Sequence, residues 1–293
     1  MTALSGPDPW NSPVDATISP PTTLGAAAVV ACCSALYGSP LIELLVGESL
    51  HPGGLRSTRE LLRASRLRPG DRLIDAGCGV GASSRVAADE FGLMVDGIDA
   101  SAGALTRARE RESAGRIRWT EADLAALPFA EAAFDGALAE CVLSTVGRRG
   151  VLTELRRVLS SGGRLVMSDV EVGVAAIPAL ANHPLLGAAL CVNEAWRPGE
   201  LEAVLPETGF VLERRWDRTA SIITLIDRVE ARVGLAAVAL RDLGLDLAAL
   251  GGVAGPLGPQ AAMPLAARRL ADDVRTAVGR GDLRYFAVLA HAS

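Results

Sequence analysis

A glycine-rich turn stands between a buried strand pattern and a helix pattern, and this arrangement could hold a small ligand. Residues 72–75 predict a short strand, a cluster of three glycines follows within 77–81, and residues 82–91 predict a helix. Glycines let the backbone approach a ligand, and the first turn of a helix offers unpaired N–H groups. The spacing Gly77-x-Gly79 also fits a dinucleotide site, so the turn predicts a cofactor-binding loop without naming the cofactor.

Three aspartates accompany this turn and narrow the choice of ligand. Asp75 precedes the first glycine, where a dinucleotide site usually has an apolar residue because a carboxylate would repel pyrophosphate. A ligand with an ammonium group would instead be attracted there. Asp99 ends the next predicted strand (94–98) and could accept both hydroxyls of a ribose. Asp123 follows a third predicted strand (117–120) and could hold an adenine amino group.

The elements that position these residues alternate between strands and helices. Four further strands are predicted, at 134–139, 164–168, 210–216 and 283–290. Helices are predicted at 24–37, 41–46, 55–65, 102–112, 151–159 and 198–205. This alternation predicts an α/β fold with a mainly parallel sheet and helices on both faces. We divide the chain into a disordered leader (1–23), an N-terminal helical cap (24–66), an α/β core (67–217 with 282–291) and a helical insertion or lid (218–281).

Composition excludes several classes of protein. The chain has 293 residues, of which 49% are hydrophobic and 22% charged, as in ordinary globular proteins and unlike disordered ones. The net charge of −5 provides no basic field, so we expect no nucleic-acid partner. No stretch has the length of a membrane span or the pattern of a secretory signal, so we expect a cytoplasmic protein with reduced thiols and no membrane partner.

Five motifs in order resemble those of class I S-adenosylmethionine-dependent methyltransferases. They are Asp75-Ala76-Gly77-Cys78-Gly79-Val80-Gly81, Asp99, Asp123, Phe134-Asp135 and Leu155-Arg156-Arg157-Val158-Leu159-Ser160-Ser161-Gly162-Gly163. The resemblance covers about residues 60–217 and the last strand. It implies a Rossmann-like seven-stranded sheet in which the last strand lies antiparallel between its neighbours. It also implies S-adenosylmethionine as cofactor, with a binding set of Asp75, Gly77, Cys78, Gly79, Asp99, Ala100, Asp123, Leu124 and Glu140.

The cysteines point to one methyl acceptor. Cys141 follows the fourth predicted strand and Cys191 comes fifty residues later, and both surroundings resemble arsenite methyltransferases. In that family, cysteines at these two places bind trivalent arsenic, and Cys33 or its neighbour Cys32 could supply a third thiolate. Arsenic(III) is thiophilic, and its lone pair can attack the sulfonium methyl without a general base. The resemblance therefore implies arsenite or an organoarsenical as the small-molecule substrate.

Two alternatives remain open. In the first, the protein is a small-molecule O-, N- or C-methyltransferase of secondary metabolism, and the cysteines do not take part in the reaction. An oxygen or nitrogen acceptor usually needs a general base, and the candidates are His51, Glu140, Asp169 and His183. Among them we single out His51, whose loss would abolish turnover while Cys141→Ser would keep it. In the second, the protein binds the cofactor or a metalloid without catalysis. The oligomeric state is not predicted.

Overall fold

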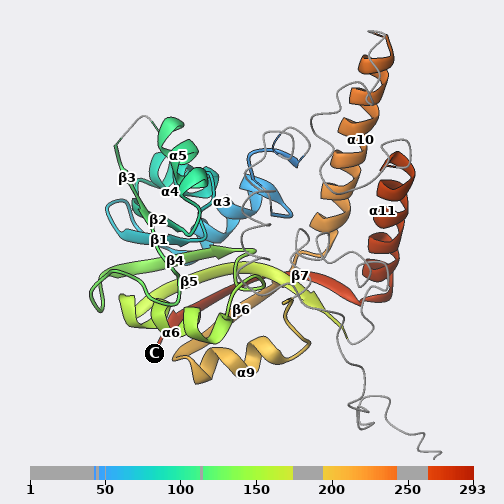
Figure 1. Cartoon of the computed structure of the whole chain (residues 1–293). Coiled ribbons are helices and arrows are strands. Elements are labelled where there is room, and N and C mark those ends of the chain that lie inside the picture. Colours follow the sequence, from blue (N-terminus) through green and yellow to red (C-terminus); the bar gives the residue numbers. More distant parts are fainter. Residues whose placement is uncertain (1–42, 44–45, 50, 113–114, 174–193, 243–262) are drawn as a thin grey trace, which may run out of the picture.

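A seven-stranded sheet forms the centre of the protein (Figure 1). The structure is a computed structural model, and it describes residues 43, 46–49, 51–112, 115–173, 194–242 and 263–293. The strands are β1 (Arg72–Ala76), β2 (Met94–Asp99), β3 (Ile117–Glu121), β4 (Phe134–Glu140), β5 (Leu159–Val172), β6 (Phe210–Asp217) and β7 (Leu283–Ala292). Their order across the sheet is β3-β2-β1-β4-β5-β7-β6.

The last strand confirms the predicted fold class. β7 lies between β5 and β6 and pairs antiparallel with both, whereas β1 to β5 pair in parallel. β5 was predicted only for 164–168, but it begins at Leu159, which pairs with Phe134 of β4, and it continues to Val172 because its pairing with β7 extends that far. The extension contains the buried polar residues Asp169 and Glu171, which a search for apolar runs does not find.

Helices cover both faces of the sheet (Figure 1). One face carries α3 (Gly54–Ser65), α4 (Ala82–Phe91) and α5 (Ala102–Glu110). The opposite face carries α6 (Arg148–Val158) and α9 (Glu200–Glu207). Between β6 and β7 in the chain come α10 (Ala220–Asp242) and α11 (Met263–Arg280), which stand side by side next to one end of the sheet. The two helices form the predicted helical segment, and their role as a lid stays a prediction.

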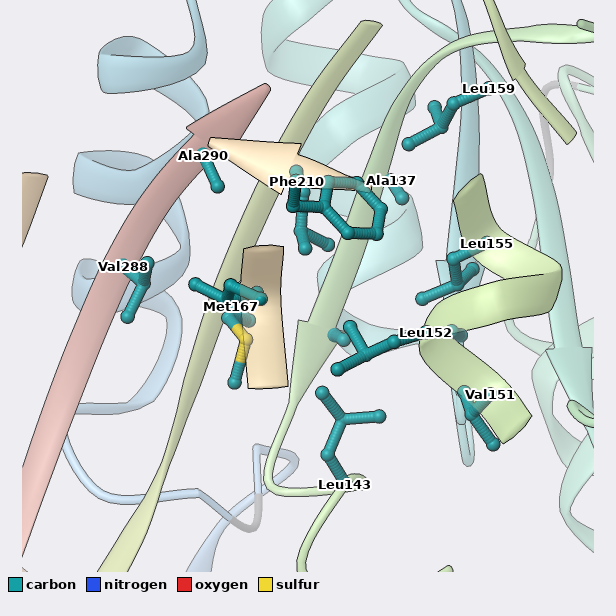
Figure 2. Close-up of a cluster of buried hydrophobic side chains, with 14 of the residues drawn as sticks. Ala137, Leu143, Val151, Leu152, Leu155, Leu159, Met167, Phe210, Val288 and Ala290 are labelled. Carbon is teal, nitrogen blue, oxygen red and sulfur yellow. The ribbon is translucent and has the colours of Figure 1, made fainter. Parts of the chain in front are cut away.

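Consecutive side chains of each strand point to opposite faces of the sheet, and a separate apolar core lies on each face. Ile74 points toward the cluster under α6 and α9, where Leu152 and Leu155 pack against Met167 (Figure 2). Its neighbour Leu73 points to the other side, into the cluster under α3 and α4. With both faces covered, the carboxyl ends of β1, β2 and β4 are held at one edge of the sheet, which is where open α/β sheets bind ligands.

Several predicted features lie outside the described residues. They include the leader, most of the N-terminal cap, and four of the candidate site residues, which are Cys32, Cys33, His183 and Cys191. The cap helix predicted at 55–65 is confirmed as α3, which begins at Gly54. None of the described helices combines the length and apolarity needed to cross a bilayer.

Candidate active site

The glycine loop between β1 and α4 is held against the end of β2. Gly77, Gly79 and Gly81 have φ of 73°, 53° and 75°, in the left-handed region that favours glycine. The backbone N–H of Gly77 donates to the Ile98 carbonyl at 2.8 Å. A Cβ added at Gly77 would lie 2.5 Å from Val142 Cγ2, whereas at Gly79 none of the described atoms would lie within 4 Å. Gly77 is therefore required for packing, and Gly79 leaves room for a ligand to approach the backbone.

Asp99 joins the loop to the next helix. One carboxylate oxygen accepts the N–H of Gly79 at 2.8 Å, and the other accepts the N–H of Ser101 at 2.8 Å. Burial raises the pKa of Asp99, and these backbone bonds oppose the rise. The Asp99 carbonyl also accepts the N–H of Ala122 at 3.2 Å, so the segment with the exposed Asp123 starts beside Asp99. The predicted ribose and adenine partners therefore lie at the same edge.

Asp75 lies at the carboxyl end of β1 and is only 3% exposed. Ser84, in the first turn of α4, donates its hydroxyl to Asp75 Oδ2 at 2.5 Å. Burial raises the pKa of Asp75 to about 7; the Ser84 bond opposes this rise, and the negative charge of Glu140 adds to it. A cation placed against Asp75 would favour its ionised form, which fits the ammonium group predicted there.

Some predicted cofactor residues contribute packing. The Cys78 side chain is 9% exposed, and burial raises the pKa of its thiol well above the usual value, so it is protonated. Leu124 is buried and belongs to the apolar cluster under α6 and α9. Their side chains therefore help to pack the loop and the core beside the predicted cofactor site. Ala100 lies between Asp99 and Ser101, just before α5.

A buried ion pair and its hydrogen bonds connect the turn before α3 with α3, α4 and β4, beside the glycine loop. His51 Nε2 lies 3.2 Å from Glu140 Oε2, and the side chains are 8% and 5% exposed. Glu140, the last residue of β4, also accepts hydroxyl hydrogen bonds from Thr58 of α3 at 2.9 Å and from Ser83 of α4 at 2.6 Å. Burial opposes both charges, yet their mutual attraction leaves the pKa of His51 raised and that of Glu140 lowered. We call these four residues the His51 network.

Cys141 points away from that network. Its backbone has φ of 54°, and its N–H donates to the Ser168 carbonyl at 2.8 Å. Its thiol donates to the hydroxyl of Tyr285 on β7 at 3.7 Å, and the Tyr285 hydroxyl donates to Ser168 Oγ at 2.8 Å. The side chain packs against the apolar cluster formed by α10, α11, β5 and β7, with Val170 and Ile222 among its members. Within the described ranges, no group of three His, Cys, Asp or Glu residues could hold a metal ion.

Comparison with known proteins identifies the family. A model of the methyltransferase domain matches residues 74–167, which include the glycine loop, Asp99 and Glu140. An O-methyltransferase from Aspergillus nomiae is 35% identical over 164 residues, which cover 53% of this chain and 71% of that protein. The chain belongs to the class I S-adenosylmethionine-dependent methyltransferases.

Two further comparisons define the extent of the likeness. An O-methyltransferase from Pyrenophora dematioidea is 34% identical over 167 residues, or 54% of this chain. The chain spans 61% of the length of that relative, which is less than two thirds. The structure of phosphoethanolamine N-methyltransferase 2 from Haemonchus contortus, in complex with S-adenosyl-L-methionine, superposes with a TM-score of 0.70 at 18% identity. It covers 89% of this chain and 57% of that one, and at this identity it establishes the methyltransferase fold alone.

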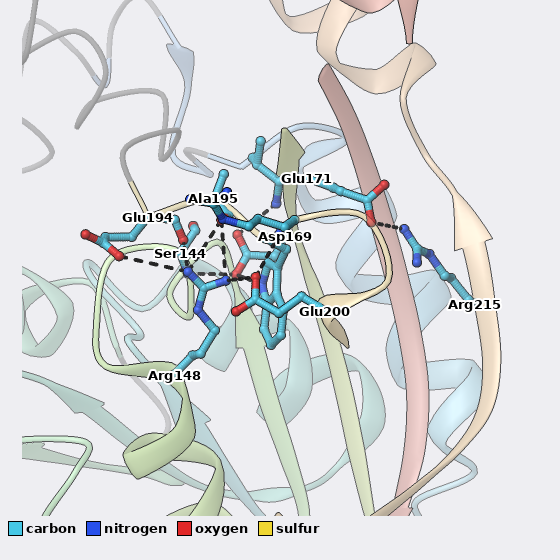
Figure 3. A network of polar contacts seen from close by, with 11 residues as sticks. Ser144, Arg148, Asp169, Glu171, Glu194, Ala195, Glu200 and Arg215 are labelled. Atoms are coloured by element: carbon cyan, nitrogen blue, oxygen red, sulfur yellow. Dashed lines mark hydrogen bonds and ion pairs between the residues drawn. The ribbon is translucent and has the colours of Figure 1, made fainter. Parts of the chain in front are cut away.

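Asp169, one of the candidate bases, is held in place by hydrogen bonds from its neighbours in this methyltransferase (Figure 3). It is fully buried and accepts hydrogen bonds from the N–H groups of Ser144 at 2.9 Å and Val170 at 2.8 Å, and from Trp196 Nε1 at 3.2 Å. Burial raises its pKa, and these bonds oppose the rise. Arg148 holds the same region by pairing with Glu200 at 3.1 Å. Asp169, on β5, therefore connects the segment after β4, which carries Ser144, with the segment before α9, which carries Trp196.

Sequence reasoning missed the hydroxyl donors of the site. Thr58, Ser83 and Ser84 were not predicted as site residues, although they hold Glu140 and Asp75. The two serines stand in the first turn of α4. Their place in the first turn after a glycine loop was the available signal, because a hydroxyl there can reach the ends of β1 and β4.

Proposed function

We propose that this methyltransferase transfers a methyl group from S-adenosylmethionine to a hydroxyl group of a small organic acceptor of secondary metabolism. The observation that carries this proposal is the 34–35% identity to two O-methyltransferases over segments of more than 160 residues. The arsenic interpretation finds no support in these comparisons, and the alternative of a small-molecule methyltransferase fits them better. The geometry of Cys141 agrees, since its thiol packs toward Tyr285 and an apolar cluster.

The residues at the carboxyl edge fit the proposed cofactor. Asp75 would receive its ammonium group, Asp99 its ribose hydroxyls and Asp123 its adenine amino group. The open position over Gly79 admits a ligand to the backbone, as a bulky cofactor requires. When bound, S-adenosylmethionine would supply a sulfonium methyl group. The acceptor oxygen would bond to this methyl as the sulfur–methyl bond breaks, S-adenosylhomocysteine would leave, and the hydroxyl proton would pass to solvent.

The charge of the site favours a cationic ligand. Asp75 and Asp99 add negative charge to the edge, whereas the charge of Glu140 is balanced by His51. A cofactor with ammonium and sulfonium groups would gain from this field, because charges interact strongly at a partly buried site. The protein would then accelerate the reaction mainly by holding acceptor and methyl group in line.

The test is a transfer assay with S-adenosylmethionine labelled in its methyl group. The purified protein is incubated with a panel of phenols and aliphatic alcohols, and separately with arsenite and a trivalent organoarsenical. Labelled methyl ethers are expected from the wild type and from Cys141→Ser, and at a much lower rate from Asp99→Asn when the cofactor is subsaturating. Label on arsenic that disappears in Cys141→Ser would contradict the proposal. Cofactor binding without transfer to any acceptor would favour the non-catalytic alternative.

A further inference from the structure

The His51 network contains a buried ion pair that has no role in the proposed function. Its members come from the turn before α3, from α3, from the first turn of α4 and from the end of β4. Glu140 follows Leu138, the β4 partner of Asp75, by two residues, so the network lies beside the glycine loop. Ser83 and Ser84 are neighbours in α4 and donate to Glu140 and Asp75 respectively. The network and the proposed ammonium site therefore share one helical turn.

The surroundings of the imidazole define its protonation state. His51 Nε2 faces a carboxylate oxygen of Glu140 at 3.2 Å, and Nδ1 faces the Pro52 carbonyl oxygen at 3.3 Å. The carbonyl and the carboxylate are acceptors, and the Thr58 hydroxyl, 3.4 Å from Nε2, gives its hydrogen to Glu140, so a hydrogen on each ring nitrogen satisfies all these contacts. An imidazole with two N–H groups is an imidazolium and has no lone pair with which to take a proton.

We propose that Glu140 is a positioning residue that holds His51 as an imidazolium and thereby fixes α3 against the glycine loop, so that His51 does not serve as the general base. Its effect on the cofactor rests on the proposed function, whereas the protonation state does not. Loss of the Glu140 charge would release the turn before α3 and the first turn of α4, which carries the Ser84 donor of Asp75.

A His51 that is held as an imidazolium and a His51 that acts as the general base predict opposite responses to pH. The titratable groups that face it are Glu140 from β4 and Asp75 from β1, with Asp99 beyond Asp75; Thr58 and Ser83 are neutral. Burial lowers the pKa of His51, but the charge of Glu140 and its hydrogen bond raise it by more. The ion pair is therefore complete below this raised pKa and is lost as pH rises through it. Cofactor affinity should fall over that interval, whereas turnover through a histidine base would rise.

The first measurement observes the imidazole directly. The chain has three histidines, so ¹⁵N-histidine labelling gives a simple spectrum, and His51→Gln assigns the signal. We expect His51 to be doubly protonated at pH 7, and its midpoint to fall below the ordinary value of about 6.5 in Glu140→Gln. The matched control is Glu90→Gln, which breaks the exposed α3–α4 pair of Arg59 and Glu90 and should leave His51 unchanged. A neutral His51 at pH 7 in the wild type would overturn the proposal.

The second measurement connects the network to the cofactor. Because Asp75 ionises near pH 7 and would strengthen binding as pH rises, the calorimetric titration with S-adenosylmethionine between pH 6 and 9 includes Asp75→Asn beside the wild type. Binding to Asp75→Asn should weaken above the His51 midpoint. At pH 7, Glu140→Gln should bind about tenfold more weakly than the wild type, because it loses a charge-assisted contact. Glu90→Gln should bind like the wild type. Equal affinity in Glu140→Gln and the wild type would overturn the positioning role. A wild type that binds no cofactor, with a doubly protonated His51, would instead refute the proposed function.

Discussion

Replacing Asp75 by Asn should stabilise the cofactor-free protein while weakening cofactor binding. The Asp75 carboxyl is 3% exposed, and burial raises its pKa from 3.8 to about 7. In the unfolded chain this carboxyl ionises at its ordinary pKa, so the native state loses stability progressively between about pH 4 and pH 7. This rise in pKa corresponds to about 4 kcal/mol of native-state stability lost above pH 7. Asn has no charge to bury and can still accept the Ser84 hydrogen bond.

The net gain in stability from Asp75→Asn is smaller than this electrostatic cost. Burying an incompletely bonded amide costs about 1–3 kcal/mol, which leaves a gain of about 2 kcal/mol at pH 8. At about 2–4 °C per kcal/mol, the melting temperature of Asp75→Asn should exceed that of the wild type by about 4–8 °C. At pH 4 the wild-type carboxyl is protonated in the native state, so only the cost of the buried amide remains, and Asp75→Asn should melt about 4–8 °C below the wild type.

The same substitution removes the partner of the cofactor ammonium. A hydrogen bond to a charged group contributes about 1.5–3 kcal/mol, so affinity for S-adenosylmethionine should fall by a factor of about 10–100. Differential scanning calorimetry and titration calorimetry measure the two effects on one preparation. Asp135→Asn, at the amino end of β4, makes the same chemical change at the opposite edge and should leave affinity unchanged. Unchanged affinity in Asp75→Asn, or a lower melting temperature at pH 8, would refute this reasoning.

Three further substitutions test the site. Gly77→Ala should destabilise the protein by about 1–3 kcal/mol and reduce cofactor affinity, because its Cβ would lie 2.5 Å from Val142 Cγ2. Adding Val142→Ala to the same chain should recover part of this stability, as urea denaturation would show. Tyr285→Phe should cost about 1–3 kcal/mol in urea denaturation, because it leaves the buried Ser168 hydroxyl without its donor. Cys141→Ser should keep methyl transfer to a hydroxyl acceptor within about threefold of the wild type, and a complete loss would return the cysteine to the mechanism.

Features that depend on local pattern were predictable from the sequence. The glycine loop, Asp75 and Asp99 follow from strand patterns that end at defined residues, and the structure brings these three features to one edge. The antiparallel pairing of β7 was implied by the family resemblance and is confirmed. The cofactor roles of these residues remain proposals.

Contacts between distant residues were not predictable. Thr58 and Glu140 are 82 positions apart, and their hydrogen bond depends on how α3 packs across the sheet. The directions of consecutive side chains were also missed. Glu140 faces α3 and α4 whereas Cys141 faces β7, so placing both residues at the sheet edge did not tell which one belongs to the cofactor side. The arsenic interpretation relied on the presence of Cys141 without knowing this direction.

The most direct test of the account is a calorimetric titration of the wild type with S-adenosylmethionine, beside Asp99→Asn. Asp99 accepts the N–H groups of Gly79 and Ser101 and would bind the ribose hydroxyls, so its charge supports both the loop and the ligand. We predict one binding site in the wild type, and affinity at least about tenfold weaker in Asp99→Asn. Absence of binding to the wild type, or equal affinity in the two proteins, would contradict the assignment of this sheet edge as the cofactor site.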